Sequence, residues 1–102
     1  MDTLFDHNPS IDERFREFDR ENPHVFRLFE RFAREVREAG HTRYSADAIL
    51  HRIRWHCNVE IRSHDFKIND HFSSRYARLL VETDQSFANF FEFRRLRSGD
   101  AA

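Results

Sequence analysis

The chain has 102 residues, of which 39% are hydrophobic and 34% charged, and its net charge of −1 excludes strong bulk attraction to nucleic acid or to an anionic membrane. This length suits one domain with a modest core, and two glycines and two prolines provide too few tight turns for an all-β fold, so we expect a mainly α domain. The single cysteine excludes an internal disulfide, and no leader or apolar run of about 18 residues is present, which predicts a cytoplasmic protein.

The first segment of the chain predicts an arm and a short helix. Residues 1–9 are expected to form a flexible arm. Ser10 followed by Glu13 makes a capping box, in which each side chain bonds the other's backbone N–H group. Apolar residues then recur on one helical face, so we expect a helix over residues 10–20.

A second helix is predicted over residues 23–39. The Asn22-Pro23 pair favours a helix start, because Asn can cap free N–H groups and Pro suits the first helical position. Gly40 follows where a left-handed residue commonly ends a helix. The apolar stripe of this helix is broad and consists of Val25, Phe26, Leu28, Phe29, Phe32, Ala33 and Val36.

The middle of the chain predicts a third helix and then a hairpin. Ser45 and Asp47 open the helix, which is expected to end near His56 and to bury Ala46, Ile49, Leu50 and Ile53. The apolar period then changes to two, since Val59, Ile61, Phe66 and Ile68 alternate with polar residues. This alternation predicts a short β-hairpin over about residues 59–68, which must lean on the helices because a lone hairpin is marginal in water.

Two more helices are predicted in the last part of the chain. Asn69 and Asp70 cap a helix over 70–83, with Phe72, Tyr76, Leu79, Leu80 and Thr83 facing inward. Asp84 or Ser86 opens the final helix, which carries Phe87, Phe90, Phe91, Phe93 and Leu96. Residues 98–102 are expected to form a frayed tail, so the domain covers 10–97.

The predicted fold is therefore a compact domain of four to five helices with one hairpin. A winged-helix-like arrangement would use three helices and the hairpin naturally. About twelve residues separate the helices at 45–57 and 70–83, whereas a helix-turn-helix needs three or four, so a standard motif of that kind is disfavoured.

Metal binding and nucleophilic catalysis are both disfavoured in the histidine-rich middle of the chain. Five possible ligands lie within 21 residues: His51, His56, Cys57, His64 and His71. Adjacent helical residues point about 100° apart, so His56 and Cys57 do not easily share one ion. Cys57 also follows a helix C-terminus, where the dipole raises the pKa of a thiol. We expect no metal, no cofactor and no enzymatic activity, and we expect Cys57 to be packed in the core.

One face of the helix over 70–83 is predicted to contact nucleic acid. Two guanidiniums, a hydroxyl and an imidazole recur there at helical spacing, on His71, Ser74, Arg75 and Arg78. Basic side chains from neighbouring segments would widen this surface, namely Arg52, Arg54 and Lys67. All of these groups can bind phosphates or base edges. The alternative is a solvated polar face, which any amphipathic helix in so charged a chain would show.

The alternative function is protein–protein interaction through the final helix, either in a homodimer or with a host protein. Phe93 projects away from the apolar stripe formed by Phe87, Phe90 and Phe91, and Leu96 follows it one turn later. An apolar face this broad indicates either a fully packed helix or an interface. We therefore name Phe93 and Leu96 as candidate partner-binding residues.

Trp55 is the open question of the stretch ILHRIRWHCNVEI at 49–61. It lies off the apolar stripe of its helix, so it either seats the hairpin against the helix or stands exposed beside Arg52. The buried position is the favoured expectation. An exposed ring beside arginines would instead make a surface for stacking and for phosphates.

The order of motifs resembles a group of small phage- and prophage-type proteins of about 100 residues. The string NPHVFRLFERFAREVREAG, IRW, DFKIND, YARLL and FFEFR carries this resemblance over roughly residues 22–97. It implies a phage or bacterial cytoplasmic setting and transfers no activity and no catalytic residue. That group often shows an NNN-like stretch after FKI, where this chain has Asn69-Asp70-His71, and the extra acid weakens a phosphate-binding interpretation.

Overall fold

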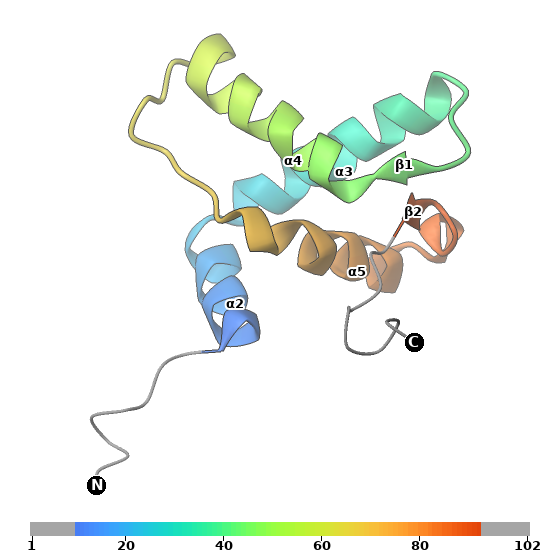
Figure 1. The fold of residues 1–102 in the computed structure, drawn as a ribbon, viewed down its shortest axis with the longest axis horizontal. Coiled ribbons are helices and arrows are strands. Elements are labelled where there is room, and N and C mark those ends of the chain that lie inside the picture. The colour runs from blue at the N-terminus through green and yellow to red at the C-terminus, as the bar shows by residue number, and fades with distance from the viewer. Residues whose placement is uncertain (1–9, 93–102) are drawn as a thin grey trace, which may run out of the picture.

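The structure is a computed structural model that describes residues 10–92, and its fold is mainly α, as predicted (Figure 1). The predicted arm at 1–9 and tail at 98–102 lie outside the described residues. The elements in chain order are α2 (Ile11–Glu21), α3 (Pro23–Glu38), β1 (Tyr44–Ser45), α4 (Ala46–Trp55), a π-helix (His56–Glu60), a 3-10 turn (Asp70–Phe72), α5 (Ser73–Thr83), a second 3-10 turn (Gln85–Phe87) and β2 (Phe91–Glu92).

The first two helices begin close to the residues that the sequence predicted. The capping box of α2 is present, since the Ser10 hydroxyl accepts from the Glu13 N–H at 3.1 Å and the Ser10 N–H donates to the Glu13 carboxylate at 2.9 Å. Asn22 differs from its predicted role. Its side chain and its backbone N–H both donate to the Phe18 carbonyl, so Asn22 closes α2 and leaves the start of α3 to Pro23.

The core is a continuous aromatic and aliphatic cluster between α3, α4 and α5. α4 packs against both α3 and α5, and α2 covers one end of the molecule beside the turn that starts α5 (Figure 1). The Phe29 ring lies at the centre, 5.6 Å from the ring of Tyr76 and 5.7 Å from that of Phe91. Phe15 reaches Tyr76 from α2 with ring centroids 4.7 Å apart. Residues from every helix therefore share one apolar interior.

The hairpin predicted for 59–68 is wrong. Instead of ending near His56, the helix continues as a π-helix to Glu60, and no residue from 61 to 69 is in a strand. Arg62 takes a left-handed conformation (φ 58°), and the Ser63 N–H donates to the Cys57 carbonyl at 2.7 Å. The cause is the burial of Cys57, one helical turn after Ile53, which favours a further turn of helix over a strand. The winged-helix-like arrangement required this hairpin and is not found in residues 10–92.

The final helix is also wrong within the described residues. A single 3-10 turn is followed by a tight turn at 88–90 and by β2, which pairs in parallel with β1 through Tyr44↔Phe91 and Ser45↔Glu92. Phe87, Phe90 and Phe91 are all buried, with neighbouring ring centroids 5.2–6.0 Å apart. Their i, i+3 and i+4 spacing would also place the three rings on one face of a helix, so the spacing alone does not distinguish a helix from the folded-back chain. In the structure, the helix-like spacing of these phenylalanines belongs to a compact turn over residues 85–91, which we call the aromatic turn.

Two arginines of α3 hold this turn in place. Arg34 donates to Glu30 at 2.7 Å and to Asp84 at 2.8 Å. The Arg37 guanidinium lies 3.8 Å from the centroid of the Phe87 ring. Hydrogen bonds from Ser86, and then from Arg34, lower the pKa of Asp84 to about 2. The aromatic turn is thus fastened to α3 by both charge and ring contacts.

We expect Phe29→Ala to lower the free energy of unfolding by roughly 3–5 kcal/mol, because it leaves a cavity at the centre of the core. Chemical denaturation followed by circular dichroism measures this change. Val59→Ala is the matched control, since Val59 is half-exposed and its truncation should change stability by less than about 0.5 kcal/mol. Equal losses in the two variants would contradict the packing described above.

The pairing of Asp84 predicts a pH dependence. Its pKa in the folded state, about 2, lies below the ordinary value of 3.8, so its contribution to stability is complete above about pH 4 and is lost as the pH falls through 2. Asp84→Asn keeps an acceptor for Ser86 but removes this titration. Denaturation at about pH 5 and pH 2 should show a smaller acid-induced loss for Asp84→Asn than for the original chain. Asp65→Asn, at an exposed carboxylate, should leave the loss unchanged.

Candidate interaction surface

The stretch that joins α4 to the π-helix has one buried face and one exposed face. Ile49, Ile53 and Cys57 follow one another at intervals of four residues and are all buried. Since neighbouring helical residues point about 100° apart, this register turns Trp55 and Val59 away from the core. The expectation that Ile49, Leu50 and Ile53 are core and that Cys57 is packed is confirmed.

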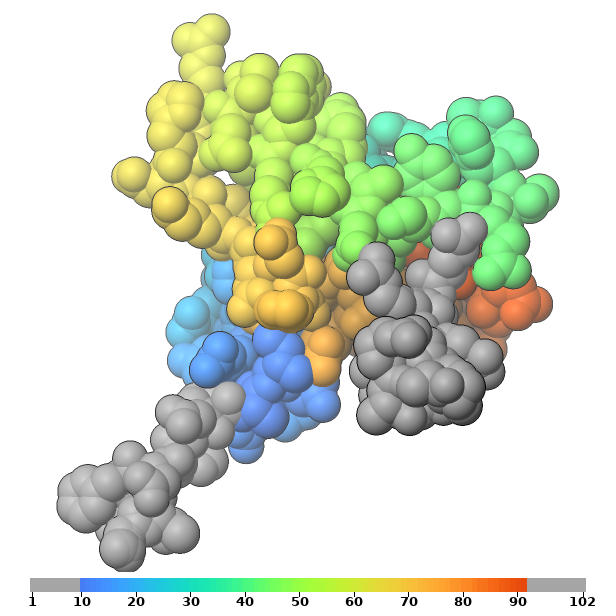
Figure 2. Space-filling model, viewed as in Figure 1, coloured from blue at the N-terminus to red at the C-terminus, as the bar shows by residue number. Residues whose placement is uncertain are grey.

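Trp55 is exposed, so the favoured expectation that its ring is buried is wrong. The exposed fractions are 52% for Trp55, 50% for Val59 and 56% for Ile61, and these are the exposed large hydrophobic residues of the described chain. We call the three residues the Trp55 patch. Figure 2 shows the end of α4 and the segment after it, in yellow-green, as a protruding corner of the molecule. The patch thus occupies an accessible position.

A charged network fastens this corner to α3. Arg52 donates to Glu60 at 3.3 Å, and the same carboxylate bonds the Nδ1 atom of His56. The Arg52 guanidinium also lies 4.3 Å from the Phe32 ring centroid and 5.3 Å from that of Trp55. The bonds from His56 and then Arg52 hold the pKa of Glu60 below its ordinary value. One carboxylate therefore joins Arg52 of α4 to His56 of the π-helix.

The predicted nucleic-acid residues do not form one free basic face. Arg75 turns toward α2 and donates to Asp12 at 2.8 Å, and it also donates to the His71 carbonyl at 3.1 Å. Arg54 donates to Asp70 and to the Ile68 carbonyl. With Arg52 bonded to Glu60, three of the predicted basic side chains have a carboxylate partner in the same chain. Their charge is therefore partly neutralised before any ligand arrives.

The remaining predicted residues are distributed over α5 and the loop before it. His71, Lys67 and Arg78 are exposed, and Ser74 is half-buried. Arg54 is brought beside the start of α5 through Asp70, whereas Arg52 contacts the π-helix. The structure thus joins Arg54 to the His71 end of the face and leaves Arg52 in a separate cluster. Phe93 and Leu96, the predicted partner-binding residues, lie outside the described residues.

Four residues belong to this surface although the sequence did not predict them there: Val59, Ile61, Glu60 and His56. The hairpin assignment placed the two aliphatic residues in a strand with one face against the helices. The available signal was the i, i+4 spacing of Trp55 and Val59, which repeats that of Ile53 and Cys57 on the opposite face. A helix that continues for four residues after His56 places Trp55 and Val59 on the exposed side.

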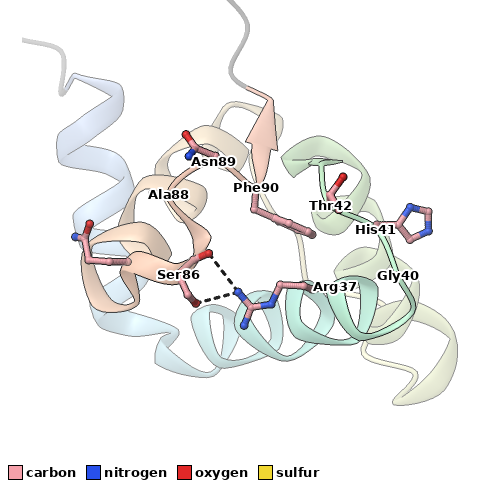
Figure 3. Close-up of a pocket in the computed structure, with 9 residues that line it drawn as sticks. Arg37, Gly40, His41, Thr42, Ser86, Ala88, Asn89 and Phe90 are labelled. Carbon is pink, nitrogen blue, oxygen red and sulfur yellow. Dashed lines mark hydrogen bonds between the residues drawn. The ribbon is translucent and has the colours of Figure 1, made fainter.

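A hollow of about 410 Å³ lies between the end of α3 and the aromatic turn (Figure 3). The Phe90 ring points toward it, and Thr42 lines it from the loop before β1. Arg37 reaches across its wall and donates to the carbonyl and the hydroxyl of Ser86 at 3.4 and 2.9 Å. Among the described residues that line this hollow, Arg37 carries the single guanidinium and uses it to close the fold, which makes the hollow a weaker candidate than the Trp55 patch.

Metal and thiol chemistry gain no support from the geometry. Within residues 10–92, no group of three or more His, Cys, Asp and Glu side chains is placed to hold a metal ion. Burial raises the pKa of the Cys57 thiol, which opposes thiolate formation. In the same part of the chain, none of the helices is both long enough and apolar enough to cross a bilayer.

Comparisons with known proteins give no indication of function, so the functional proposal depends on the physical features described above. No family model, no curated protein and no solved structure matches the chain.

The exposure of Trp55 predicts a simple spectroscopic result. It is the only tryptophan, so all indole fluorescence reports on this position. For the purified chain at low concentration, we expect an emission maximum close to that of a tryptophan amide in water, with ready quenching by acrylamide. The unfolded chain provides the reference for full exposure. A strongly blue-shifted and poorly quenched emission would contradict an exposed ring.

Proposed function

We propose that this chain is a small non-enzymatic interaction module that docks a partner protein on the Trp55 patch. The observation that carries the proposal is the clustering of three large, half-exposed apolar side chains within seven residues. Apolar groups gathered on a protruding surface typically mark interaction sites, and Trp is enriched among the residues that dominate binding energy. A patch of three side chains is small, so the complex is expected to be transient.

The surroundings of the patch support a pre-organised site. Glu60 bonds Arg52 and His56, and Arg52 packs against both Phe32 and Trp55. These contacts limit the rotamers that Arg52 and the indole can adopt before binding. Less side-chain entropy is then lost when a partner covers the ring.

Nucleic-acid binding remains a second candidate, because Trp55 stands exposed beside Arg52 and single strands bind by stacking on aromatic rings flanked by cations. Two observations favour protein over nucleic acid. The net charge is −1, and carboxylates of the same chain pair with Arg52, Arg54 and Arg75. If nucleic acid is the ligand, its affinity should fall steeply above ~50 mM salt, and Arg75→Ala with Arg78→Ala should reduce that salt dependence only if the α5 face takes part.

The test is affinity capture from a bacterial lysate, the source that the phage-type resemblance suggests. Val59→Asp puts a charge in the patch while keeping Trp55, and Gln85→Asp adds the same charge at an exposed site on the aromatic turn. We expect a captured protein that is retained by the original chain and by Gln85→Asp, is lost with Val59→Asp, and resists nuclease treatment. Circular dichroism and thermal unfolding confirm that both variants are folded.

Two results would contradict the proposal. Capture that Val59→Asp does not affect would place the contact elsewhere on the chain. Capture that nuclease abolishes would make nucleic acid the ligand in place of protein.

A further inference from the structure

We infer that the partner of the Trp55 patch is an acidic amphipathic segment, with two or three apolar side chains flanked by carboxylates. This inference rests on the proposed function and adds the chemistry of the occupant. It follows from the distribution of charge around the patch and from the size of the patch.

The charge around the patch opposes that of the rest of the chain. Residues 51–62 contain Arg52, Arg54 and Arg62 but only one acid, Glu60, and counting Asp70, which pairs with Arg54, leaves a net charge of +1 with neutral histidines. The whole chain carries −1, and the remaining residues therefore carry −2. The exposed apolar side chains lie within a locally positive part of a negative molecule. Complementary potential between two surfaces favours an anionic partner.

Arg62 is the cation that is best placed to contact such a partner. It directly follows Ile61, it is exposed, and no ion pair holds it within residues 10–92. Its left-handed backbone conformation (φ 58°) marks the point where the chain leaves the π-helix. Arg52 borders the patch at Trp55, 5.3 Å from that ring centroid, and shares the Glu60 carboxylate with His56. Two basic groups therefore border the apolar side chains.

The size of the patch limits its occupant to one segment. Trp55, Val59 and Ile61 span seven residues of helical chain and its exit, which corresponds to a length of about 10 Å at 1.5 Å per residue. A helix of two or three turns presents a matching stripe through its i, i+3 and i+4 residues. A large domain face would leave most of its own surface without contact here.

A second copy of the chain fits less well. A symmetric contact between two Trp55 patches would bring +1 against +1, with Arg62 present on both sides. Like charges that face one another across an interface reduce affinity. A segment with carboxylates beside its apolar residues avoids this repulsion and gains the attraction of Arg62.

The test uses two synthetic helical peptides with an identical Leu and Phe face, one flanked by Glu and the other by Lys. Each is titrated into the full chain, and binding is followed by the emission of Trp55 and by the anisotropy of a labelled peptide. We expect the Glu peptide to shift the Trp55 emission to shorter wavelength and to bind at least about tenfold more tightly than the Lys peptide. Val59→Asp should abolish binding, and Gln85→Asp should not affect it.

Charge reversal at Arg62 provides the sharper test. Arg62→Glu should weaken the Glu peptide and strengthen the Lys peptide, whereas Arg16→Glu, a matched reversal at an exposed position of α2, should change neither. Equal affinity for both peptides, abolished by Val59→Asp, would overturn the acidic partner but leave the proposed docking site intact. Three other results would also overturn the inference: no binding of either peptide, binding that Val59→Asp does not affect, and tighter Val59-dependent binding of an oligothymidylate. The capture experiment then decides the proposed function separately.

Discussion

Burial of Ile53 and Cys57 on one side of an uninterrupted helix determines which side chains at the end of α4 and in the π-helix are exposed to solvent. Both side chains are almost inaccessible to solvent, and their spacing fixes the rotation of every residue around them. Because the helix must continue past Trp55 to bury Cys57, the indole and Val59 are carried outward on the opposite side. The chain accepts exposed apolar surface at this corner as the geometric consequence of completing its core.

The π-helix is the local adjustment that makes this possible. It follows α4 without a break. At its end the Ile61 N–H donates to the His56 carbonyl, and Arg62 then takes a left-handed conformation. Wider turns of this kind are rare and frequently occur at functional sites. Here the wide turn brings the Glu60 carboxylate within reach of both Arg52 and His56, so the exposed corner is held by a network and not by apolar packing alone.

The local signals in the sequence predicted most of the helical fold. The Ser10 and Glu13 pair, Pro23 and the stripe of α3 depend on contacts a few residues apart, and all three predictions are confirmed. The hairpin and the final helix failed because their apparent periods had another origin. Val59 and Ile61 alternate without sharing a buried face, and Phe87, Phe90 and Phe91 fill the core from a turn. Periodicity records which residues are apolar and does not show which of them reach the interior.

The candidate site was harder to predict than the fold, since it depends on pairs that are distant in the sequence. Arg75 and Asp12 are separated by most of the described chain, and nothing in the pattern of α5 indicates that Arg75 is occupied. Helical spacing predicted basic groups on one face of α5, but their availability depends on which acids the tertiary structure brings near. For Trp55 the sequence left two orientations open, buried or exposed, and the burial of Cys57 selects the exposed one.

The short parallel pairing of Tyr44 with Phe91 has a consequence for how the chain folds. It joins the residues just before α4 to almost the last residues that the structure describes, so the loop that it closes contains α4, the π-helix and α5. Contacts this far apart in sequence form late, because the entropy of closing the loop is lost before they contribute. During synthesis, β1 and α4 therefore emerge from the ribosome well before β2, the partner strand of β1, exists. The corner that carries Trp55 is then exposed on a nascent chain whose core is still incomplete.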